Sequence, residues 1–402
     1  MKRFTPIIFF FFIVKFSFAQ FTICNSNTSA TLTDVYFIDA QIGIAVGDSG
    51  KILRSIDAGL NWVAVMTNDT VLFRKVSFFD SQNGIAIGSD IYITDDAGLS
   101  WQNVTIGFNA CTDLQIVNDT TCFVTSVNVS LLKSVDAGAT FDTVYNNLTA
   151  DLDLISFVND TLGYACDAYG GFATKTLKTT DGGFSWNELH DTSQFPNPTV
   201  MEDMVFISED IGFKAGWYNA HLQKTVDGAK TWAHTITNDT SVSYQIYDLF
   251  ISKNMPNAYY ACGWYGEVYK STDGGNSWLG LTSGVSSTTS LYGAFFLNEN
   301  LGWIVGANGT ILKTQSGGIG IQENLTATEL NLYPNPASAE INISIAQKSR
   351  IFEVRIYSMS GVTIIKSNSA ESSIHISSLK AGIYVLEVET GKGIARQKFI
   401  KE

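Results

Sequence analysis

A chain of 402 residues, of which 45% are apolar and 16% are charged, is long enough to bury the cores of more than one domain. The small charged share and the 34 glycines favour a turn-rich, all-β, extracytoplasmic protein over a helical cytosolic enzyme. The segment from Gln20 to Asn324 carries 13 basic and 31 acidic residues, and this balance argues against nucleic acid and anionic lipid as partners.

Residues 1–19 are predicted to be a signal peptide. Lys2 and Arg3 supply its positive start, and an apolar run from Pro6 to Val14 follows. Ser17-Phe18-Ala19 places small residues where cleavage before Gln20 is expected. The run is too short for an uncleaved anchor, and no later stretch could span a membrane, so the mature protein is expected to have no transmembrane segment.

One short motif, Ser/Thr-x-Asp-x-Gly-x-x-Trp, recurs through residues 20–318 at intervals of 39 to 46 residues, with Phe for Trp in the third copy. Its aspartates are Asp57, Asp96, Asp136, Asp181, Asp227 and Asp273. A degenerate seventh copy, from Thr314 to Gly318, lacks Asp and Trp. Four short strands with their turns fill such a period. The segment is therefore predicted to be an all-β, seven-bladed β-propeller, with the motif in the turn between the third and fourth strands of each blade.

The seventh repeat ends at its motif and has no fourth strand of its own. Phe21 precedes Val35, which opens strand one of the first repeat, by 14 residues, as Trp62 precedes Val76 in the second. Phe21 to Cys24 is therefore expected to form the outermost strand of blade seven. This pairing would close the ring and remove an exposed sheet edge.

The motif resembles the Asp-box, or BNR, repeat of sialidase-like and photosystem II assembly factor-like proteins. In families that carry it, the Asp-box is structural and lies away from the ligand face, which implies that the six aspartates hold turns. Sialidases also grip a carboxylate with several arginines, whereas residues 20–324 contain only Arg54 and Arg74. Sialidase activity is therefore argued against.

No catalytic or metal-binding pattern stands out, and no cofactor is expected. The five cysteines are an odd number without CxxC spacing, and the four histidines are scattered. Cys166 and Cys262 occupy the same strand-two position of two repeats that do not touch, so no disulfide between them is expected. Carboxylates for a glycosidase pair are nevertheless plentiful, which leaves a hydrolase open.

The loops between strands two and three open on the face opposite the Asp-boxes, and three successive ones are aromatic. Exposed aromatic rings stack on sugars or form protein hot spots. The candidate ligand contacts are Tyr169, Trp217, Tyr218, Trp264 and Tyr265. The alternative is that these rings fill gaps between blades. Because arginines are few and acids many, a neutral glycan or a protein is the expected ligand.

A polar linker at 319–328 ends the repeats, and short alternating strands predict a small Ig-like β-sandwich at 329–402. Tyr-Pro-Asn-Pro-Ala, Ile-Tyr-Ser-Met-Ser-Gly, Leu-Lys-Ala-Gly-Ile-Tyr and Lys-Phe-Ile-Lys in this segment resemble the type A C-terminal sorting domain of type IX secretion in Bacteroidetes. The motif residues are Pro334, Asn335, Pro336, Gly382, Tyr384 and Lys398. The resemblance implies that the type IX secretion machinery is a partner, and that the domain is removed after export.

The sequence thus predicts a propeller that is secreted or placed on the outer cell surface by way of the periplasm. Non-catalytic binding or adhesion is the leading function. A secreted glycan-degrading hydrolase and a structural surface protein without a discrete ligand are the alternatives. Well-packed acids at the central funnel would favour the hydrolase, and a flat aromatic patch would favour the binding protein.

Overall fold

The computed structural model describes residues 21–67, 70–104, 110–127, 130–146, 152–166, 176–189, 200–217, 222–235, 245–252, 254–256, 258–318, 330–345, 351–358, 363–367, 373–390 and 393–402. The predicted signal peptide lies outside these ranges. The chain divides into two compact units, Met1–Gly320 and Ile321–Glu402.

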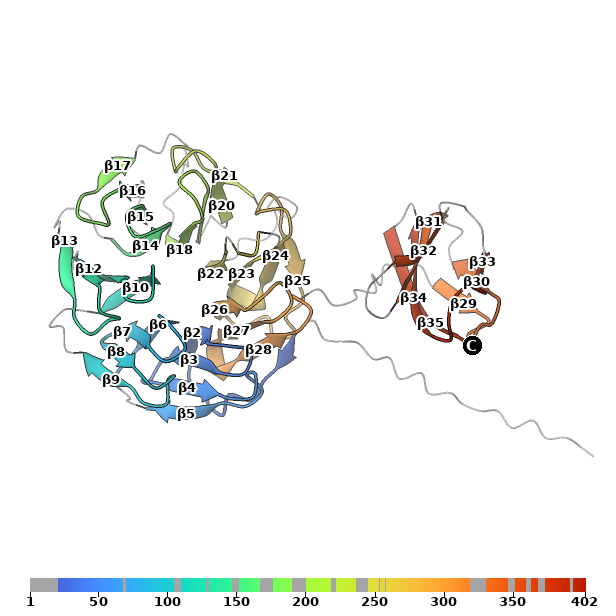
Figure 1. The fold of residues 1–402 in the computed structure, drawn as a ribbon, viewed down its shortest axis with the longest axis horizontal. Helices are drawn as coiled ribbons and strands as arrows, with labels where there is room; N and C mark the ends of the chain where they lie inside the picture. Colours follow the sequence, from blue (N-terminus) through green and yellow to red (C-terminus); the bar gives the residue numbers. More distant parts are fainter. Residues whose placement is uncertain are drawn as a thin grey trace, which may run out of the picture. The chain divides into compact units, whose positions relative to one another are not determined.

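The described part of the first unit contains seven four-stranded antiparallel sheets around a common axis, which we number as blades 1 to 7 (Figure 1). Blade 1 is β2 (Leu32–Phe37), β3 (Gly43–Gly47), β4 (Ile52–Ser55) and β5 (Val63–Met66), and blade 2 is β6 (Phe73–Phe78), β7 (Gly84–Gly88), β8 (Ile91–Thr94) and β9 (Gln102–Val104). Blade 3 is β10 (Cys111–Ile116), β11 (Cys122–Ser126), β12 (Ser130–Ser134) and β13 (Asp142–Asn146), and blade 4 is β14 (Leu154–Phe157), β15 (Gly163–Cys166), β16 (Thr176–Thr179) and β17 (Asn187–Leu189).

Blade 5 is β18 (Met201–Phe206), β19 (Gly212–Gly216), β20 (Leu222–Thr225) and β21 (Ala233–His234). Blade 6 is β22 (Ile246–Phe250), β23 (Tyr259–Gly263), β24 (Val268–Ser271) and β25 (Leu279–Leu281), with the short 3₁₀ turn η2 (Trp264–Gly266) after β23. Blade 7 is β26 (Leu291–Phe296), β27 (Gly302–Gly306), β28 (Ile311–Thr314) and β1 (Thr22–Ile23), with η3 (Ala307–Gly309) after β27. This strand order is that of a β-propeller, the predicted fold class.

The core of the propeller lies between consecutive blades. Every residue of β3, β7 and β27 is buried, whereas the outermost β5 and β9 are largely exposed, so the short apolar runs are the inner strands. Aromatic rings stack across the blade boundaries. The ring centroids of Phe37 and Trp303 are 3.3 Å apart, and those of Tyr164 and Phe206 are 3.6 Å apart. Each blade therefore buries one face against each of its neighbours.

The N-terminal strand completes blade 7, as the closure prediction requires. Thr22 pairs with Lys313 and Ile23 with Leu312, and the Cys24 N–H donates to the Ile311 carbonyl at 2.8 Å. Phe21 is buried in the blade 6–7 core, where Trp62 occupies the corresponding place at the blade 7–1 boundary. The first and last parts of the propeller sequence are thereby joined in one sheet.

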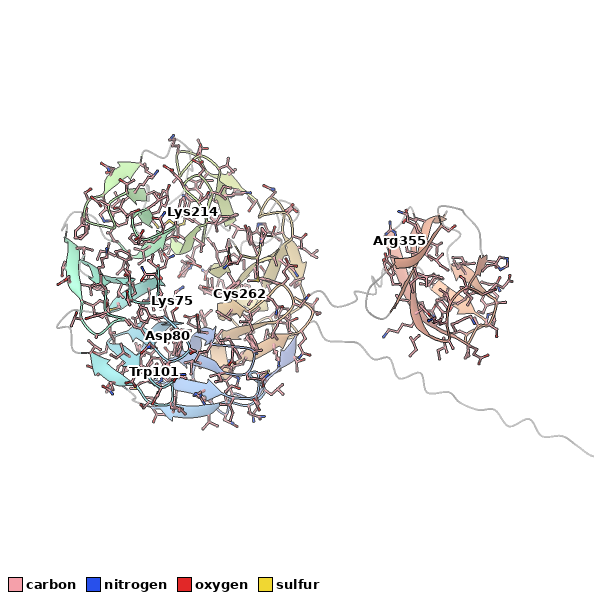
Figure 2. The ribbon with its side chains drawn as sticks, viewed as in Figure 1. Lys75, Asp80, Trp101, Lys214, Cys262 and Arg355 are labelled. Carbon is pink, nitrogen blue, oxygen red and sulfur yellow. The ribbon has the colours of Figure 1, made fainter. Side chains whose placement is uncertain are left out.

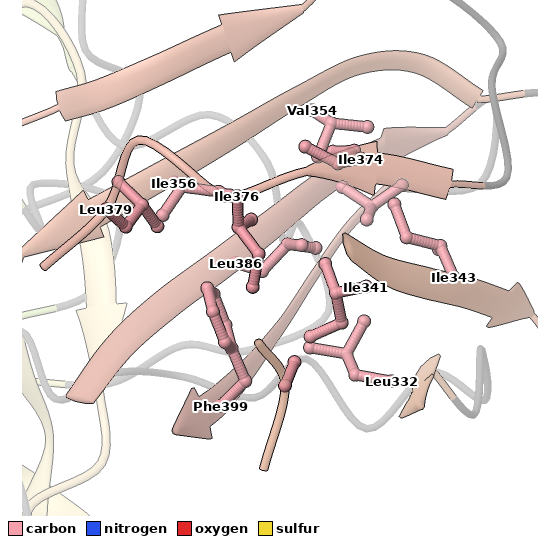
Figure 3. Close-up of a cluster of buried hydrophobic side chains, with 12 residues drawn as sticks. Leu332, Ile341, Ile343, Val354, Ile356, Ile374, Ile376, Leu379, Leu386 and Phe399 are labelled. Carbon is pink, nitrogen blue, oxygen red and sulfur yellow. The ribbon is translucent and has the colours of Figure 1, made fainter. Parts of the chain in front are cut away.

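The second unit contains two antiparallel sheets that enclose one apolar core (Figure 3). One sheet is β29 (Leu330–Tyr333), β30 (Glu340–Ile345) and β33 (Ser373–His375). The other has the order β32 (Thr363–Ser367), β31 (Ile351–Ser358), β34 (Gly382–Thr390) and β35 (Gly393–Lys401). Fully buried Ile341, Ile356, Leu386 and Phe399 fill the space between them, which is the sandwich that the alternating pattern predicts.

All five cysteines lie in the described part of the chain, where they are buried and form no disulfide. Burial raises the pKa of the Cys111 and Cys122 thiols to about 12, so these thiols stay protonated and unreactive at neutral pH. Among the described residues, no helix has the length and apolar character needed to cross a bilayer.

Candidate functional site

All six Asp-box aspartates accept hydrogen bonds from within their own turns. In each of blades 1 to 6 the Ser or Thr hydroxyl donates to Asp Oδ1 at 2.8 Å and accepts the N–H of the fifth motif residue at 2.8–3.0 Å. The same Oδ1 also accepts the N–H of the residue four positions after the aspartate, at 2.9 Å. Hydrogen bonds from Ser185 and Ser277 hold the pKa values of Asp181 and Asp273 at about 2. These carboxylates have the geometry of turn supports.

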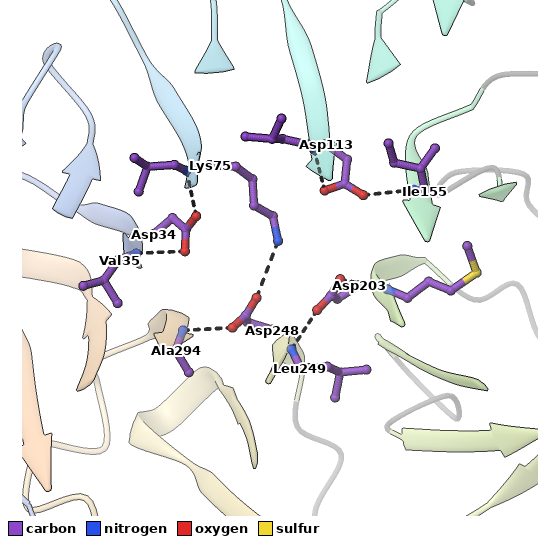
Figure 4. Close-up of polar contacts among 12 residues, drawn as sticks. Asp34, Val35, Lys75, Asp113, Ile155, Asp203, Asp248, Leu249 and Ala294 are labelled. Atoms are coloured by element: carbon purple, nitrogen blue, oxygen red, sulfur yellow. Dashed lines mark hydrogen bonds and ion pairs between the residues drawn. The ribbon is translucent and has the colours of Figure 1, made fainter. Parts of the chain in front are cut away.

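A ring of charged side chains lies at the propeller axis (Figure 4), and sequence reasoning missed it. The first strands of blades 1, 3, 5 and 6 carry Asp34, Asp113, Asp203 and Asp248 at equivalent positions, and blade 2 carries Lys75 there. Lys75 extends towards the middle of the ring (Figure 2), with its Nζ 3.6 Å from Asp248 Oδ1.

Each axial aspartate joins its blade to the next through backbone hydrogen bonds. Asp34 Oδ2 accepts the Val76 N–H of blade 2 at 2.8 Å, and Asp203 Oδ2 accepts the Leu249 N–H of blade 6 at 2.8 Å. Asp113 binds Ile155 of blade 4 at 2.9 Å, and Asp248 binds Ala294 of blade 7 at 2.8 Å. In Asp34, Asp113 and Asp203 the second oxygen also accepts a backbone N–H, from the next residue of the same strand, at 2.8 Å. The acids at the axis are therefore held by the backbone of two blades, which is the geometry of a structural ring.

The aromatic residues described on the opposite face lie in adjacent blades 5 and 6. Trp217 directly follows β19, and Trp264 and Tyr265 form η2 directly after β23. The Trp264 and Tyr265 rings stack face to face, with centroids 4.6 Å apart and planes 8° apart, and 40% of Tyr265 is exposed. Tyr169 and Tyr218 lie outside the described residues.

A close backbone approach positions the two tryptophans. The strand-two glycine before each one is packed so tightly that a Cβ on Gly216 would lie 1.9 Å from the Val200 carbonyl oxygen, and one on Gly263 would lie 2.0 Å from that of Gln245. The next N–H donates to the same carbonyl, at 2.9 Å for Trp217 and 2.8 Å for Trp264. The backbone that carries each indole is thus held next to the start of the first strand of its own blade.

The turn that carries Tyr265 has the same form in blades 1 and 7. Its middle residue is left-handed in all three, with φ of +56° at Ser49, +57° at Tyr265 and +55° at Asn308, and a left-handed Gly follows each. Asn tolerates this region well, whereas a bulky aromatic residue rarely adopts it. Blade 6 therefore holds a ring outward at a position where the other two blades carry small polar residues.

Near the start of the first strands, beside these loops, lies a set of polar and aromatic side chains that the sequence analysis did not single out. In six blades the first strand has a β-bulge directly before the axial position, at Thr33, Arg74, Thr112, Glu202, Tyr247 and Tyr292. Only a strand register reveals a bulge. An aspartate directly before an apolar residue of strand one does recur in four repeats, however, and could have directed attention to the axis.

In the second unit the sorting-motif residues join the Pro-Asn-Pro loop to the last strand. Asn335 Oδ1 accepts the Ile400 N–H at 2.9 Å, and Asn335 Nδ2 donates to the Lys398 carbonyl at 3.3 Å. Tyr384 stacks on Phe399 at 5.7 Å, and its hydroxyl donates to the Lys380 carbonyl at 2.9 Å. Gly382 opens β34, opposite Lys401.

Family models match a part of each unit. Residues 331–402 match the secretion system C-terminal sorting domain, and residues 219–315 match the photosynthesis system II assembly factor YCF48. Over 314 residues the chain is 24% identical to the photosystem II assembly lipoprotein Ycf48 of Picosynechococcus sp.. The aligned stretch covers 71% of this chain and 85% of that protein. A stretch of 73 residues is 36% identical to β-agarase D of Zobellia galactanivorans, but it spans only 18% of this chain and 15% of the agarase.

Solved structures show the same fold. YCF48 bound to a D1 peptide superimposes with a TM-score of 0.61 at 18% identity, over 74% of this chain and 98% of that one. PorZ, a surface component of the type IX secretion system of Porphyromonas gingivalis, gives a TM-score of 0.54 at 11% identity, over 92% of this chain and 59% of PorZ. The propeller carries YCF48-type repeats, and its C-terminal domain is a type IX sorting domain that directs the protein to the cell surface or outside the cell.

Proposed function

We propose that the propeller is a non-catalytic binding or adhesion module whose strand two–three face holds a neutral glycan or a protein. The observation that carries the proposal is the face-to-face Trp264–Tyr265 pair, in which the left-handed Tyr265 is exposed and Trp264 is partly exposed; Trp217 occupies the corresponding loop of the adjacent blade. A ring kept outward at the cost of an unfavourable backbone conformation is better explained by a contact than by core packing. Tyr169 and Tyr218 would extend this surface.

YCF48 offers a parallel, because a propeller of this fold has been captured with a peptide. The chain differs in having only Arg54 and Arg74 between residues 20 and 324, so an anionic segment is a poor candidate for its ligand.

A secreted glycan-degrading hydrolase is the second candidate, because acids do gather at the axis. Burial raises the pKa of Asp248 to about 7, and Lys75 acts in the opposite direction. The backbone contacts of these acids favour the structural role. Release of reducing ends, measured alongside binding, separates the two candidates: turnover that is lost in Asp248→Asn would establish the hydrolase.

Transplanting the blade 7 turn into blade 6 tests the binding surface. The double substitution W264A/Y265N converts Trp-Tyr-Gly into Ala-Asn-Gly, the sequence that already forms this turn at Ala307–Gly309. We expect binding to weaken by about 2 kcal/mol or more, the scale of an aromatic hot spot, with little change in melting temperature. Glycan-array and calorimetric binding, with differential scanning calorimetry, would measure both. A large loss of stability with unchanged affinity would show that the rings belong to the core.

Removal of residues 330–402 tests the role of the second unit in the cell. Because the two units are separately compact, the propeller should remain folded while the protein accumulates in the periplasm. Fractionation and immunoblotting measure the distribution. Asn335→Ala, which removes both hydrogen bonds between the Pro-Asn-Pro loop and the last strand, should give a weaker defect of the same kind. Normal amounts of truncated protein at the surface or in the medium would contradict the role in export.

A further inference from the structure

The bulged residues of blades 5 to 7 differ from those of blades 1 and 3 in how their polar groups are used. Thr33 Oγ1 donates to the carbonyls of Val46 and Phe73, at 3.2 and 3.0 Å, and Thr112 Oγ1 lies 2.8 Å from Thr125 Oγ1. These hydroxyls serve contacts within and between blades. On the other side of the ring the same positions carry Glu202, Tyr247 and Tyr292, larger side chains that are all partly exposed. The bulge positions of blades 1 and 3 therefore carry small hydroxyls that are used inside the propeller, whereas those of blades 5 to 7 carry larger, partly exposed polar side chains.

The larger side chains form one connected group with the aromatic loops. Tyr247 and Tyr292 have ring centroids 4.9 Å apart, and the Tyr247 hydroxyl donates to Gln245 Oε1 at 2.7 Å. The Trp217 indole lies close enough to Glu202 to lower the pKa of its carboxyl, and the Trp264 backbone N–H donates to the Gln245 backbone carbonyl at 2.8 Å. Aromatic rings thus lie beside a carboxylate, phenols and a carboxamide on three consecutive blades.

The charges within the group oppose each other. Burial raises the pKa of Glu202, while the nearby Trp217 indole and the positive charge of Arg74 on blade 2 lower it. Burial also raises the pKa of Tyr247 to about 12, so its phenol remains a neutral donor. Arg74 would disfavour a cationic ligand and Glu202 an anionic one, whereas the hydroxyl groups of a neutral ligand can donate both to Glu202 and to the Tyr247 oxygen, whose own proton is directed to Gln245.

We infer that Glu202, Gln245, Tyr247 and Tyr292 form the polar half of a site for an uncharged sugar ring, with Trp217, Trp264 and Tyr265 as its aromatic half. This inference rests on the proposed function, because it assigns a ligand class to the same face. A sugar presents an apolar ring face together with a rim of hydroxyls, and the two halves match these features. An extended protein segment would need unpaired backbone or an apolar groove, and the described residues of this face offer hydroxyl-directed groups instead.

The test uses the mature full chain and a panel of fragments of β-1,4-glucan, β-1,3-glucan, xylan and mannan, with uronic acid oligomers for comparison. Binding is followed by calorimetry. For a neutral oligosaccharide that binds, we expect Glu202→Gln and the double variant Y247F/Y292F each to weaken affinity roughly tenfold or more. Glu202→Gln replaces a charged acceptor oxygen with an amide donor, Y247F/Y292F removes two hydroxyl groups, and both keep size. Val127→Ala is the matched control, since Val127 occupies the corresponding loop position of blade 3 and is 44% exposed; it should leave affinity unchanged.

The outcomes separate this inference from the proposed function. If W264A/Y265N abolishes binding of a neutral sugar but Glu202→Gln and Y247F/Y292F do not alter it, the polar half is assigned wrongly and the binding face stands. If the face captures only proteins or uronic acid oligomers, the ligand class is wrong. If no variant on this face changes the binding of any ligand, the proposed function itself fails. Melting temperatures of all variants within a few degrees of the parent ensure that affinity is what has changed.

Discussion

Replacing Lys75 with Met is expected to destabilise the propeller by roughly 2–4 kcal/mol at pH 8 and by much less at pH 5. Removal of one partner from a buried ion pair usually costs about 3–5 kcal/mol, and the 29% exposure of the Lys75 side chain places this case towards the lower end. Burial disfavours the charged form of Lys75, but Asp203, Asp248, Asp113 and Asp34 together outweigh it and raise its pKa well above the usual range. Lys75 therefore stays charged across the whole interval.

The direction of the pH effect follows from the aspartates. Burial raises the pKa values of Asp34 and Asp113 to about 6 and that of Asp248 to about 7, whereas Lys75 lowers all three. A carboxyl whose pKa is higher in the folded state than in the unfolded state adds stability at low pH, and this stability is lost as pH rises through 6 to 7. The parent protein should thus gain stability between pH 8 and pH 5, and Lys75→Met should gain more.

Denaturant titrations at the two pH values would measure this difference. Lys75→Arg keeps the charge and serves as one control, and exposed Lys230→Met serves as the other. Combining Lys75→Met with Asp248→Asn should recover part of the loss at pH 8, because the amide oxygen can still accept the Ala294 N–H. An equal loss at both pH values would mean that Lys75 acts through packing. The Asp-box carboxylates do not interfere, since Asp181 and Asp273 titrate at about 2.

The axial ring also shows what the sequence could not provide. The Asp-box spacing predicted the turn positions and the propeller, because each turn is local and its hydrogen bonds span only four residues. The contacts of Asp34 and Asp203 cross to residues 42 and 46 positions away in another blade, so their purpose depends on how blades pack. The bulges depend on register in the same way, and Glu202 and Tyr247 were missed for that reason.

Blade 5 contains a second feature that the repeat pattern concealed. Lys214 and Gln223 are paired across β19 and β20 and are only 3% and 1% exposed, whereas the corresponding positions of blade 1 are Ala45 and Leu53. Lys214 Nζ lies 4.3 Å from the centroid of the Trp232 ring (Figure 2 labels Lys214). Alignment of the repeats by their Asp-boxes hides such exchanges, because the turn is kept while the blade interior changes.

Phe21→Ala is expected to destabilise the propeller by roughly 3–5 kcal/mol, the usual cost of truncating a buried Phe. Phe21 is 3% exposed, and its ring lies so close to Gly318 that a Cβ there would be 2.9 Å from Cζ. Its strand supplies the fourth strand of blade 7, so the loss should fall on ring closure as well as on local packing. Equilibrium unfolding in urea would measure the change in free energy.

Ile23→Ala is the matched control for this prediction. Ile23 lies in the same strand and pairs with Leu312, but 64% of it is exposed, so its truncation should cost well under 1 kcal/mol. Hydrogen exchange adds a readout of closure: in Phe21→Ala the Cys24 N–H, which binds the Ile311 carbonyl, should lose protection before the amides of blade 4 do. If Phe21→Ala and Ile23→Ala have equally small effects, the N-terminal strand is not needed for closure, and the core between blades 7 and 1, which includes Trp303 and Phe37, is sufficient to hold the ring closed.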